Sequence, residues 1–396
     1  MLIVCILGIL VLSIRAPGAE EPGIPILAWI GPPEAETNEV RYRELADAGF
    51  THNFSGFSNI DAMEKALNVA QATGIKQFVS IPELQSAPEM VAERFKGHPA
   101  LAGYHLRDEP SAADFLALAK WVKQIQAIDP VHACYINLFP NYANGPQLGT
   151  PTYKEHLDRF IKEVPVPFIS FDHYPVVGNS LRGEWYENLE QVSAAARAAK
   201  KPFWAFALAV AHNPYPIAEI EHLRLQVFSN LAYGAQGIQY FTYWTVKSPH
   251  WNFHQAPIEV DGKRTVVYDR VKQVNSEIRG LAKVFKDAEV LRVGHTGKLP
   301  LGTRAFEPAL PIKALKTGES GAVVSTLAKG DQLALVIVNR DLRSNMPLEV
   351  IFDRAANVSE VFKDGATRPI ASAEIHAELP PGDIRVFTWN AKGDGR

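Results

Sequence analysis

Short apolar runs alternate with longer amphipathic segments along most of this chain, from Ile26 to about Lys286. The apolar runs cover residues 26–31, 50–57, 76–84, 101–110, 132–139, 167–175, 202–212 and 237–244. In the segments between them, apolar residues recur at three- and four-residue steps, and the last such segment covers residues 268–285. Continuous apolar strands that alternate with helices form parallel sheets covered on both faces, and eight such units over roughly 250 residues match a closed barrel. The pattern therefore predicts an α/β fold of the (β/α)8 TIM-barrel type.

The remaining sequence defines the domain boundaries that we expect. After residue 287 the chain changes to short alternating runs separated by Lys-Gly-Asp, Lys-Asp-Gly and Pro-Pro-Gly-Asp turns, which predicts a C-terminal antiparallel β-sandwich over residues 288–396. The barrel then occupies residues 20–287.

The first turn of the predicted barrel reads GPPEAE and lacks a G-x-G-x-x-G fingerprint, so we expect no dinucleotide cofactor, and no other cofactor is indicated.

The N-terminal residues 1–19 form an apolar run followed by small residues, which is typical of a secretory signal peptide cleaved after Ala19. This run is too short to span a membrane as a helix, and no later stretch has the length and apolar character to do so. We therefore expect a secreted or periplasmic protein without stable membrane insertion. Cleavage would remove Cys5 and leave Cys134 as the only thiol, so no internal disulfide is expected.

Charge excludes one class of partner. The chain carries 40 Lys and Arg against 43 Asp and Glu, a formal net charge of -3, and no basic stripe is present. Nucleic-acid binding is therefore not expected. The sequence leaves the oligomeric state open.

Polar and aromatic residues end most of the predicted strands. In a TIM barrel these positions meet at one rim, where active sites are built. The predicted substrate-binding residues are Trp29, Asn53, Glu83, Arg107, Asp108, Asn137, His173, Tyr174, His212, Tyr243 and Trp244, and the predicted catalytic residues are Glu109 and Asp172. Paired carboxyls can cleave a glycosidic bond, and aromatic rings can stack on a sugar, so we expect a carbohydrate substrate.

Two segments carry a resemblance to a known group of enzymes. LAGYHLRDEP resembles the fourth barrel strand of clan A TIM-barrel glycoside hydrolases, near the β-galactosidase-like (family 42-type) enzymes, and AYGAQGIQYFTYW resembles their eighth strand. The resemblance covers roughly residues 26–285. It implies that Glu109 is the general acid/base, with Asp108 where the family often has Asn, and that Trp244 forms the floor of the sugar site.

The chain departs from this family at the seventh strand. Clan A enzymes place a nucleophilic Glu at the end of that strand, whereas PFWAFALAVAHNPYP contains no Asp or Glu. Asp172, in FDHYP, is the first candidate for the second carboxylate and Glu83 is the second. Each of these carboxylates also has a purely structural alternative. Asp172 could stabilise a turn or cap a helix, Glu83 could lie exposed in a loop, and Glu109 could stabilise a helix N-terminus.

The sequence thus predicts a secreted glycoside hydrolase in which Glu109 is the general acid and Asp172 the base or nucleophile. Because Asp is shorter than Glu and leaves room for water, we expect inversion at the anomeric carbon.

No H-E-x-x-H motif occurs and no H-x-H follows the first strand, so no metal is expected. A carbohydrate-binding pseudoenzyme and a non-standard sugar-cleaving enzyme such as a lyase remain as alternatives.

Overall fold

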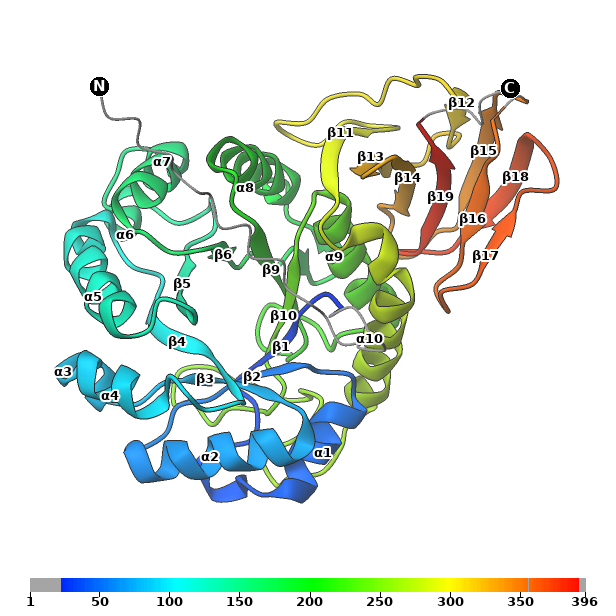
Figure 1. The fold of residues 1–396 in the computed structure, drawn as a ribbon. Helices are drawn as coiled ribbons and strands as arrows, with labels where there is room; N and C mark the ends of the chain where they lie inside the picture. The colour runs from blue at the N-terminus through cyan, green and yellow to red at the C-terminus, as the bar shows by residue number, and fades with distance from the viewer. Residues whose placement is uncertain (1–22, 355, 392–396) are drawn as a thin grey trace, which may run out of the picture.

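Eight parallel strands close into a barrel in the order β1-β10-β9-β6-β5-β4-β3-β2 (Figure 1). The computed structural model describes residues 23–354 and 356–391, so the predicted signal peptide lies outside the described residues. The barrel strands are β1 (Ile26–Trp29), β2 (His52–Phe54), β3 (Lys76–Val79), β4 (Leu101–Asp108), β5 (Ala133–Leu138), β6 (Ile169–Phe171), β9 (Phe203–Leu208) and β10 (Gly237–Phe241). The predicted TIM barrel is confirmed.

Helices surround the barrel and join consecutive strands (Figure 1). They are α1 (Glu39–Asp47), α2 (Ile60–Thr73), α3 (Glu83–Ser86), α4 (Pro88–Phe95), α5 (Phe115–Ile128), α6 (Gly145–Leu148), α7 (Tyr153–Glu163), α8 (Trp185–Ala199), α9 (Ile220–Ala232) and α10 (Val266–Phe285). The side chain of Asn59 caps α2 by accepting a hydrogen bond from the Ala62 N–H. Gly74, with φ 75°, ends the same helix in a left-handed conformation that glycine adopts without strain.

The sequence pattern did not predict helix α4, the second of the two helices between β3 and β4. Helix α4 covers only eight residues, Pro88–Phe95, and buries Pro88, Val91, Ala92 and Phe95. These positions follow helical spacing, but two turns are too few for a clear periodic signal.

The C-terminal domain consists of two antiparallel sheets, as the sequence predicts. One has six strands in the order β11-β13-β14-β19-β16-β17 and the other three in the order β12-β15-β18. Their bounds are β11 (Glu289–His295), β12 (Ile312–Lys316), β13 (Ala322–Lys329), β14 (Gln332–Asn339), β15 (Met346–Phe352), β16 (Ser359–Val361), β17 (Thr367–Pro369), β18 (Glu374–Leu379) and β19 (Ile384–Asn390). A hydrophobic cluster that includes Leu335, Leu348 and Phe387 fills the space between the sheets. On the other face of the larger sheet, Val336 and Val386 join the hydrophobic core of the barrel domain.

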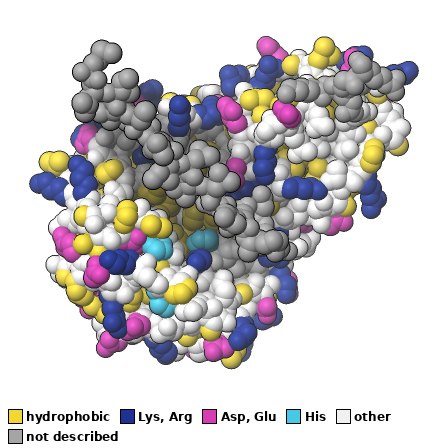
Figure 2. All heavy atoms as spheres, viewed as in Figure 1, with side chains coloured by type: hydrophobic (Ala, Val, Ile, Leu, Met, Phe, Trp, Pro, Cys, Tyr) yellow, Lys and Arg dark blue, Asp and Glu magenta, His cyan; other side chains and the backbone are white. Residues whose placement is uncertain are grey.

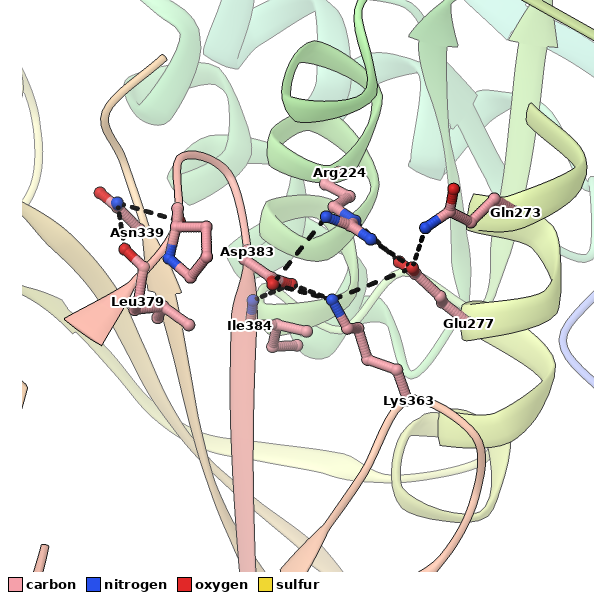
Figure 3. A network of polar contacts seen from close by, with 9 residues as sticks. Arg224, Gln273, Glu277, Asn339, Lys363, Leu379, Asp383 and Ile384 are labelled. Carbon is pink, nitrogen blue, oxygen red and sulfur yellow. Dashed lines mark hydrogen bonds and ion pairs between the residues drawn. The ribbon is translucent and has the colours of Figure 1, made fainter. Parts of the chain in front are cut away.

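An ion-pair network also joins the two domains (Figure 3). Arg224 on α9 donates through Nε to Glu277 Oε2 at 3.0 Å, and Glu277 lies on α10. From the β domain, Lys363 Nζ lies 2.6 Å from Asp383 Oδ1 and 3.9 Å from Glu277 Oε1. All four side chains point towards one another, and Glu277 is 8% exposed. Glu277 therefore balances cations from both domains.

Removing Glu277 is expected to destabilise the fold. Glu277→Ala leaves Arg224 without its bidentate partner in a poorly hydrated interface, which costs about 3 kcal/mol of unfolding free energy. The control is Glu64→Ala, which breaks the exposed Glu64–Arg94 pair and costs less than about 1 kcal/mol. Urea unfolding of both variants measures the difference; equal losses would contradict a structural role for the network.

Charges of both signs are interspersed over the face of the molecule seen in Figure 2. This agrees with the nearly balanced charge of the whole chain. Within the part of the chain that the structure describes, no helix is both long and apolar enough to cross a membrane.

Candidate active site

The site is built around the end of β4. The pairing of β4 with β5 shifts register between His105 and Arg107, so that Asp108 lies beside Asn137. A β-bulge of this kind re-aims the side chains that follow it, and such bulges occur often beside active sites. Leu106, at the shift, is buried in the core outside the barrel. The bulge thus brings the Asp108 and Asn137 side chains together.

Glu109 follows directly and has an unusual backbone conformation. Its φ is 45°, in the left-handed region that residues other than glycine rarely adopt, and its N–H donates to the Asn137 carbonyl oxygen at 2.8 Å. Such a conformation costs of order 1–3 kcal/mol and is often found at functional sites, where the surrounding structure maintains it. Backbone geometry therefore singles out the same residue as the sequence.

Asn137 connects two carboxyl groups through its side-chain amide. Its Nδ2 donates to Asp108 Oδ1 at 3.0 Å and to Asp172 Oδ1 at 2.9 Å. Its Oδ1 accepts a hydrogen bond from Ser170 Oγ at 2.8 Å, and Ser170 Oγ in turn accepts one from Gln239 Nε2 at 2.9 Å. Because the amide oxygen is occupied by the Ser170 hydroxyl, the NH2 group must face the carboxyls. Sequence reasoning missed Ser170 and Gln239, which fix the direction of this amide.

The carboxyl groups of Asp108, Glu109 and Asp172 are close enough to affect one another's protonation. Partial burial, reinforced by the negative charge of Asp108, raises the pKa of Glu109 to about 7. Burial raises the pKa of Asp172 well above its usual range, and the charges of Glu109 and Asp108 raise it further. Desolvation also raises the pKa of Asp108, although its side chain is partly exposed, and the Asn137 hydrogen bond and the Arg107 charge oppose this increase. Ionisation of one of these carboxyl groups therefore makes ionisation of its neighbours less favourable.

The raised pKa of Glu109 predicts a pH-dependent stability. Its pKa is about 7 in the folded chain, against about 4.3 in an unfolded chain, so the folded state binds more protons between these values. The free energy of unfolding contributed by Glu109 is therefore lost as pH rises from about 4 to 7. Glu109→Gln removes this titration, so we expect the variant to equal the wild type near pH 4 and to gain roughly 3 kcal/mol on it by pH 8.

Thermal unfolding at the two pH values measures this gain. Glu64→Gln, on the exposed side of α2, is the matched control. A stability difference between Glu109→Gln and the wild type that stays the same at both pH values would contradict the raised pKa.

Aromatic side chains form a wall next to the carboxyls. The Tyr174 ring lies 5.7 Å from that of Phe241 and 6.1 Å from that of Tyr215, and the pKa of Tyr174, raised mainly by burial, is raised further by the charge of Asp172. Tyr174 thus interacts electrostatically with Asp172 and contacts rings at the end of β10 and in the loop after β9.

The wall continues along those loops. His212 contacts Phe253 at a ring distance of 4.6 Å, Tyr215 at 4.7 Å and Trp251 at 5.7 Å. Trp251 is 54% exposed, which is unusual for the largest side chain in proteins. The structure thus brings the predicted residues Tyr174 and His212 together with Phe241, Tyr215, Trp251 and Phe253, which sequence reasoning missed. The aromatic-rich segment HWNFH (250–254) was the available signal.

Trp29 lies inside the barrel. Its ring is packed against those of Phe54 at 4.4 Å, His105 at 5.1 Å, Phe206 at 5.1 Å and Tyr135 at 5.6 Å, and only 5% of it is exposed. Burial lowers the pKa of His105 to about 3, so its imidazole is neutral. Trp29 therefore contributes mainly to the packed interior.

Three other predicted residues lie on the helix side of the strands, away from the carboxyls. Asn53 Nδ2 donates to Gln77 Oε1 at 2.8 Å and to the Tyr42 hydroxyl of α1 at 3.2 Å. The Tyr243 ring contacts Phe50, and Trp244 lies under the guanidinium of Arg41 at 5.2 Å. Tyr243 and Trp244 belong to the core between barrel and helices. The structure does not bring these three together with Glu109 and Asp172.

The remaining predicted residues lie at the edges of the site. His173 is turned towards α8, where its Nδ1 lies 2.9 Å from Asn188 Oδ1. Glu83 begins α3, after the strand next to β4, and its Oε2 is buried without a hydrogen-bond partner among the described residues. Arg107 is exposed, and its charge acts on Asp108. Within residues 23–354 and 356–391, no group of three or more His, Cys, Asp or Glu side chains could hold a metal ion.

Part of the sequence matches the model of a known protein family. Residues 140–281 match the glycoside hydrolase family 42 model, described as beta-galactosidase. The matched segment includes Asp172 and the aromatic wall but begins after Glu109. No protein with curated annotation matches the chain.

Solved structures of glycoside hydrolases share the fold. A β-galactosidase from Bacillus circulans sp. alkalophilus has a TM-score of 0.65 at 10% identity, over 93% of this chain and 99% of that one. A catalytic mutant of a family 42 β-galactosidase from G. stearothermophilus has a TM-score of 0.63 at 10% identity, over 93% and 98%. A family 39 glycoside hydrolase from the gut symbiont Bacteroides cellulosilyticus WH2 has a TM-score of 0.55 at 10% identity, over 93% and 81%.

Coverage differs among the structural matches. The chain spans 60% of the length of a β-galactosidase from the psychrophilic Marinomonas ef1. The structural likenesses show the fold, and the matched segment adds a sequence relationship. The chain is thus a TIM-barrel protein that resembles the clan A glycoside hydrolases of the β-galactosidase, family 42 type, with sequence similarity to that family over residues 140–281.

Proposed function

We propose that this protein hydrolyses a glycosidic bond in an oligosaccharide or polysaccharide, with Glu109 as general acid and Asp172 as the base that activates water. The observation that carries the proposal is the position of two carboxyl groups after β4 and β6 that interact electrostatically. Burial raises both pKa values, the charge of Asp108 raises that of Glu109 further, and the charge of Glu109 raises that of Asp172 further. The sequence similarity to family 42 over residues 140–281 supports the same reaction class.

Glycosidic cleavage needs one protonated and one ionised carboxyl group. The protonated group delivers its proton to the leaving oxygen, and the ionised group activates water or attacks the anomeric carbon. Two carboxyls that repel each other's charge retain a single proton over a wide pH range, as this reaction requires.

Exposure favours Glu109 as the proton donor. Its side chain is partly exposed and can reach the oxygen of a bound substrate, whereas Asp172 is only 7% exposed. When the proton is on Glu109, Glu109 no longer repels the charge on Asp172, and Asn137 Nδ2 stabilises the ionised Asp172 carboxylate. In the alternative assignment, Asp172 is the proton donor and Glu109 the base, and the effects of Asp172→Asn and Glu109→Gln on a series of leaving groups distinguish the two.

The aromatic wall is the proposed surface for the sugar rings. The rings of Tyr174 and Phe241 lie next to the carboxyl groups, and the exposed face of Trp251 extends the surface outward. The C–H faces of sugars are apolar and stack on such rings.

Turnover experiments test the proposal. A panel of nitrophenyl glycosides and natural oligosaccharides is incubated with the full chain, and released reducing ends are measured. We expect hydrolysis of at least one glycoside. Binding without turnover would favour the carbohydrate-binding pseudoenzyme, and ultraviolet absorbance of an unsaturated product would reveal a lyase; both results would contradict hydrolysis.

We also propose that the protein is exported, on the basis of the apolar run and small residues in 1–19. N-terminal sequencing of the protein from its natural host should begin near Glu20. A product that retains Met1 would contradict cleavage.

A further inference from the structure

A cleft of about 420 Å³ lies between the barrel and the C-terminal domain. Residues 181–183, in and after the short strand β8 (Ser180–Leu181), line its barrel side. Residues 298–301 and Arg340 line the opposite side. The cleft is separate from the carboxyl groups of Glu109 and Asp172.

Three cationic residues line this cleft: Arg182, Lys298 and Arg340. Among the described residues, none of them forms an ion pair with a carboxylate. Within the described part of the chain, the Arg340 guanidinium donates only to the carbonyl oxygens of Thr296 at 2.8 Å and Lys298 at 2.9 Å, and its Nε has no hydrogen-bond partner there. Burial lowers the pKa of Arg340, because a desolvated guanidinium without a counter-ion is costly. The three cationic residues of the cleft thus lack a direct carboxylate partner within the described part of the chain.

Two carboxyl groups, Glu319 and Asp341, also line the cleft. Asp341 Oδ1 already accepts the backbone N–H groups of Arg343 at 2.7 Å and Ser344 at 2.8 Å, which fixes it in its own turn. The cations therefore outnumber the carboxylates, and one carboxylate is engaged elsewhere.

Arg182 links the cleft to the candidate active site. Its Nη2 donates to the Tyr215 hydroxyl at 2.9 Å, and its guanidinium lies 4.6 Å from the centre of the Tyr142 ring. Tyr142 contacts the ring of His173, and the charge of Asp172 adds to the burial that raises the pKa of Tyr142. A chain of contacting side chains thus runs from His173, which follows Asp172 in the sequence, through Tyr142 to Arg182 at the cleft.

We propose that this cleft binds the anionic group, a carboxylate or a sulfate, of an acidic saccharide chain that extends from the active site. This inference rests on the proposed glycosidase function and specifies its substrate class. Guanidinium and ammonium groups bind such oxyanions, and the exposed side chains of Leu299 and Leu301 offer apolar surface to the C–H face of the same sugar.

Calorimetric titration of the full-length Glu109→Gln variant, which is expected to slow turnover of these oligosaccharides, tests the proposal. The probes are tetragalacturonate, a sulfated galactotetraose and neutral galactotetraose. We expect at least one anionic probe to bind about tenfold more tightly than the neutral one, and added salt to reduce this preference. The two anionic probes distinguish a uronate from a sulfate ester.

Reversing the charge of one residue of the cleft then tests whether the anionic probe binds there. Lys298 is exposed and its ammonium forms no hydrogen bond among the described residues, so Lys298→Glu should fold normally. It should weaken the anionic probe about five- to tenfold and leave the neutral probe and the turnover of a neutral aryl glycoside unchanged. Lys65→Glu, on the exposed face of α2, is the matched control.

Each outcome decides between specific alternatives. Equal binding of neutral and anionic probes, equal effects of Lys298→Glu and Lys65→Glu, or competition by inorganic sulfate at the same concentration as the sulfated probe would overturn the acidic-saccharide site while leaving the glycosidase proposal intact. Failure of every saccharide to bind, together with no turnover of any glycoside by the wild type, would overturn both.

Discussion

Glu109→Gln is expected to slow the hydrolysis of glycosides with poor leaving groups, such as methyl glycosides, by about 10²–10⁴-fold. Glutamine keeps the shape of the side chain but carries no transferable proton, so the leaving oxygen must depart as a poorly stabilised anion. Dinitrophenyl glycosides need little acid assistance, and their hydrolysis should fall much less. Steady-state kinetics across a series of leaving groups measures this change in sensitivity.

The wild-type pH profile gives an independent check. Because the pKa of Glu109 is about 7, kcat/KM for a poor leaving group should fall above this pH as the acid ionises. The fall should disappear in Glu109→Gln. Wild-type rates of the variant on methyl glycosides would exclude Glu109 as the acid.

Asp172→Asn is expected to reduce turnover by about 10²–10⁴-fold for all leaving groups alike. The amide keeps an oxygen that can accept from Asn137 Nδ2, so the local geometry is retained. It cannot take a proton from water, and this step is needed whatever group departs. The same leaving-group series as for Glu109→Gln provides the measurement.

Glu83→Gln is the matched control for Asp172→Asn, because Glu83 follows the strand next to β4 and is the other carboxyl considered for this role. A large loss in Glu83→Gln with little change in Asp172→Asn would assign the second carboxylate to Glu83. If the loss in Asp172→Asn instead depends on the leaving group, Asp172 is the proton donor and the two roles are exchanged.

The barrel and the convergence of Glu109, Asp108, Asn137 and Asp172 follow from the sequence. Alternation of apolar runs with amphipathic segments fixes a parallel barrel, and a barrel brings the carboxyl ends of its strands to one rim. Polar residues placed immediately after buried strands must then meet there, and the hydrogen bonds of Asn137 to Asp108 and Asp172 agree with this expectation.

The direction of individual side chains could not be predicted in the same way. On neighbouring strands, Ala28 and Gln77 lie at the same level as Asn53, and their side chains face the helices as the Asn53 side chain does. The next residues along β1 and β2, Trp29 and Phe54, face the barrel interior. Successive side chains alternate between the two faces, so an error of one residue in the register exchanges them. Apolar patterning does not locate a strand to one residue when both of its faces are buried.

The aromatic wall and the cleft depend on loops and on domain packing. Tyr215, Trp251 and Phe253 come from segments whose conformation no periodicity specifies, and they meet only after β9 and β10 are neighbours in the barrel. Lys298 and Arg340 meet Arg182 only where the β domain packs against the barrel. Contacts of this kind require the folded structure.

Residues 203–214, where clan A enzymes carry the nucleophilic Glu, contain no carboxylate. The stereochemistry of the first product therefore shows whether Asp172 activates water on the side of the sugar opposite the acid Glu109. NMR spectra recorded during the first minutes of hydrolysis distinguish the anomers before mutarotation mixes them. We expect the sugar to be released with inverted configuration, because a single displacement by water inverts the anomeric carbon. Release of the retained anomer would contradict it, because retention requires a covalent intermediate on a carboxylate that acts as nucleophile.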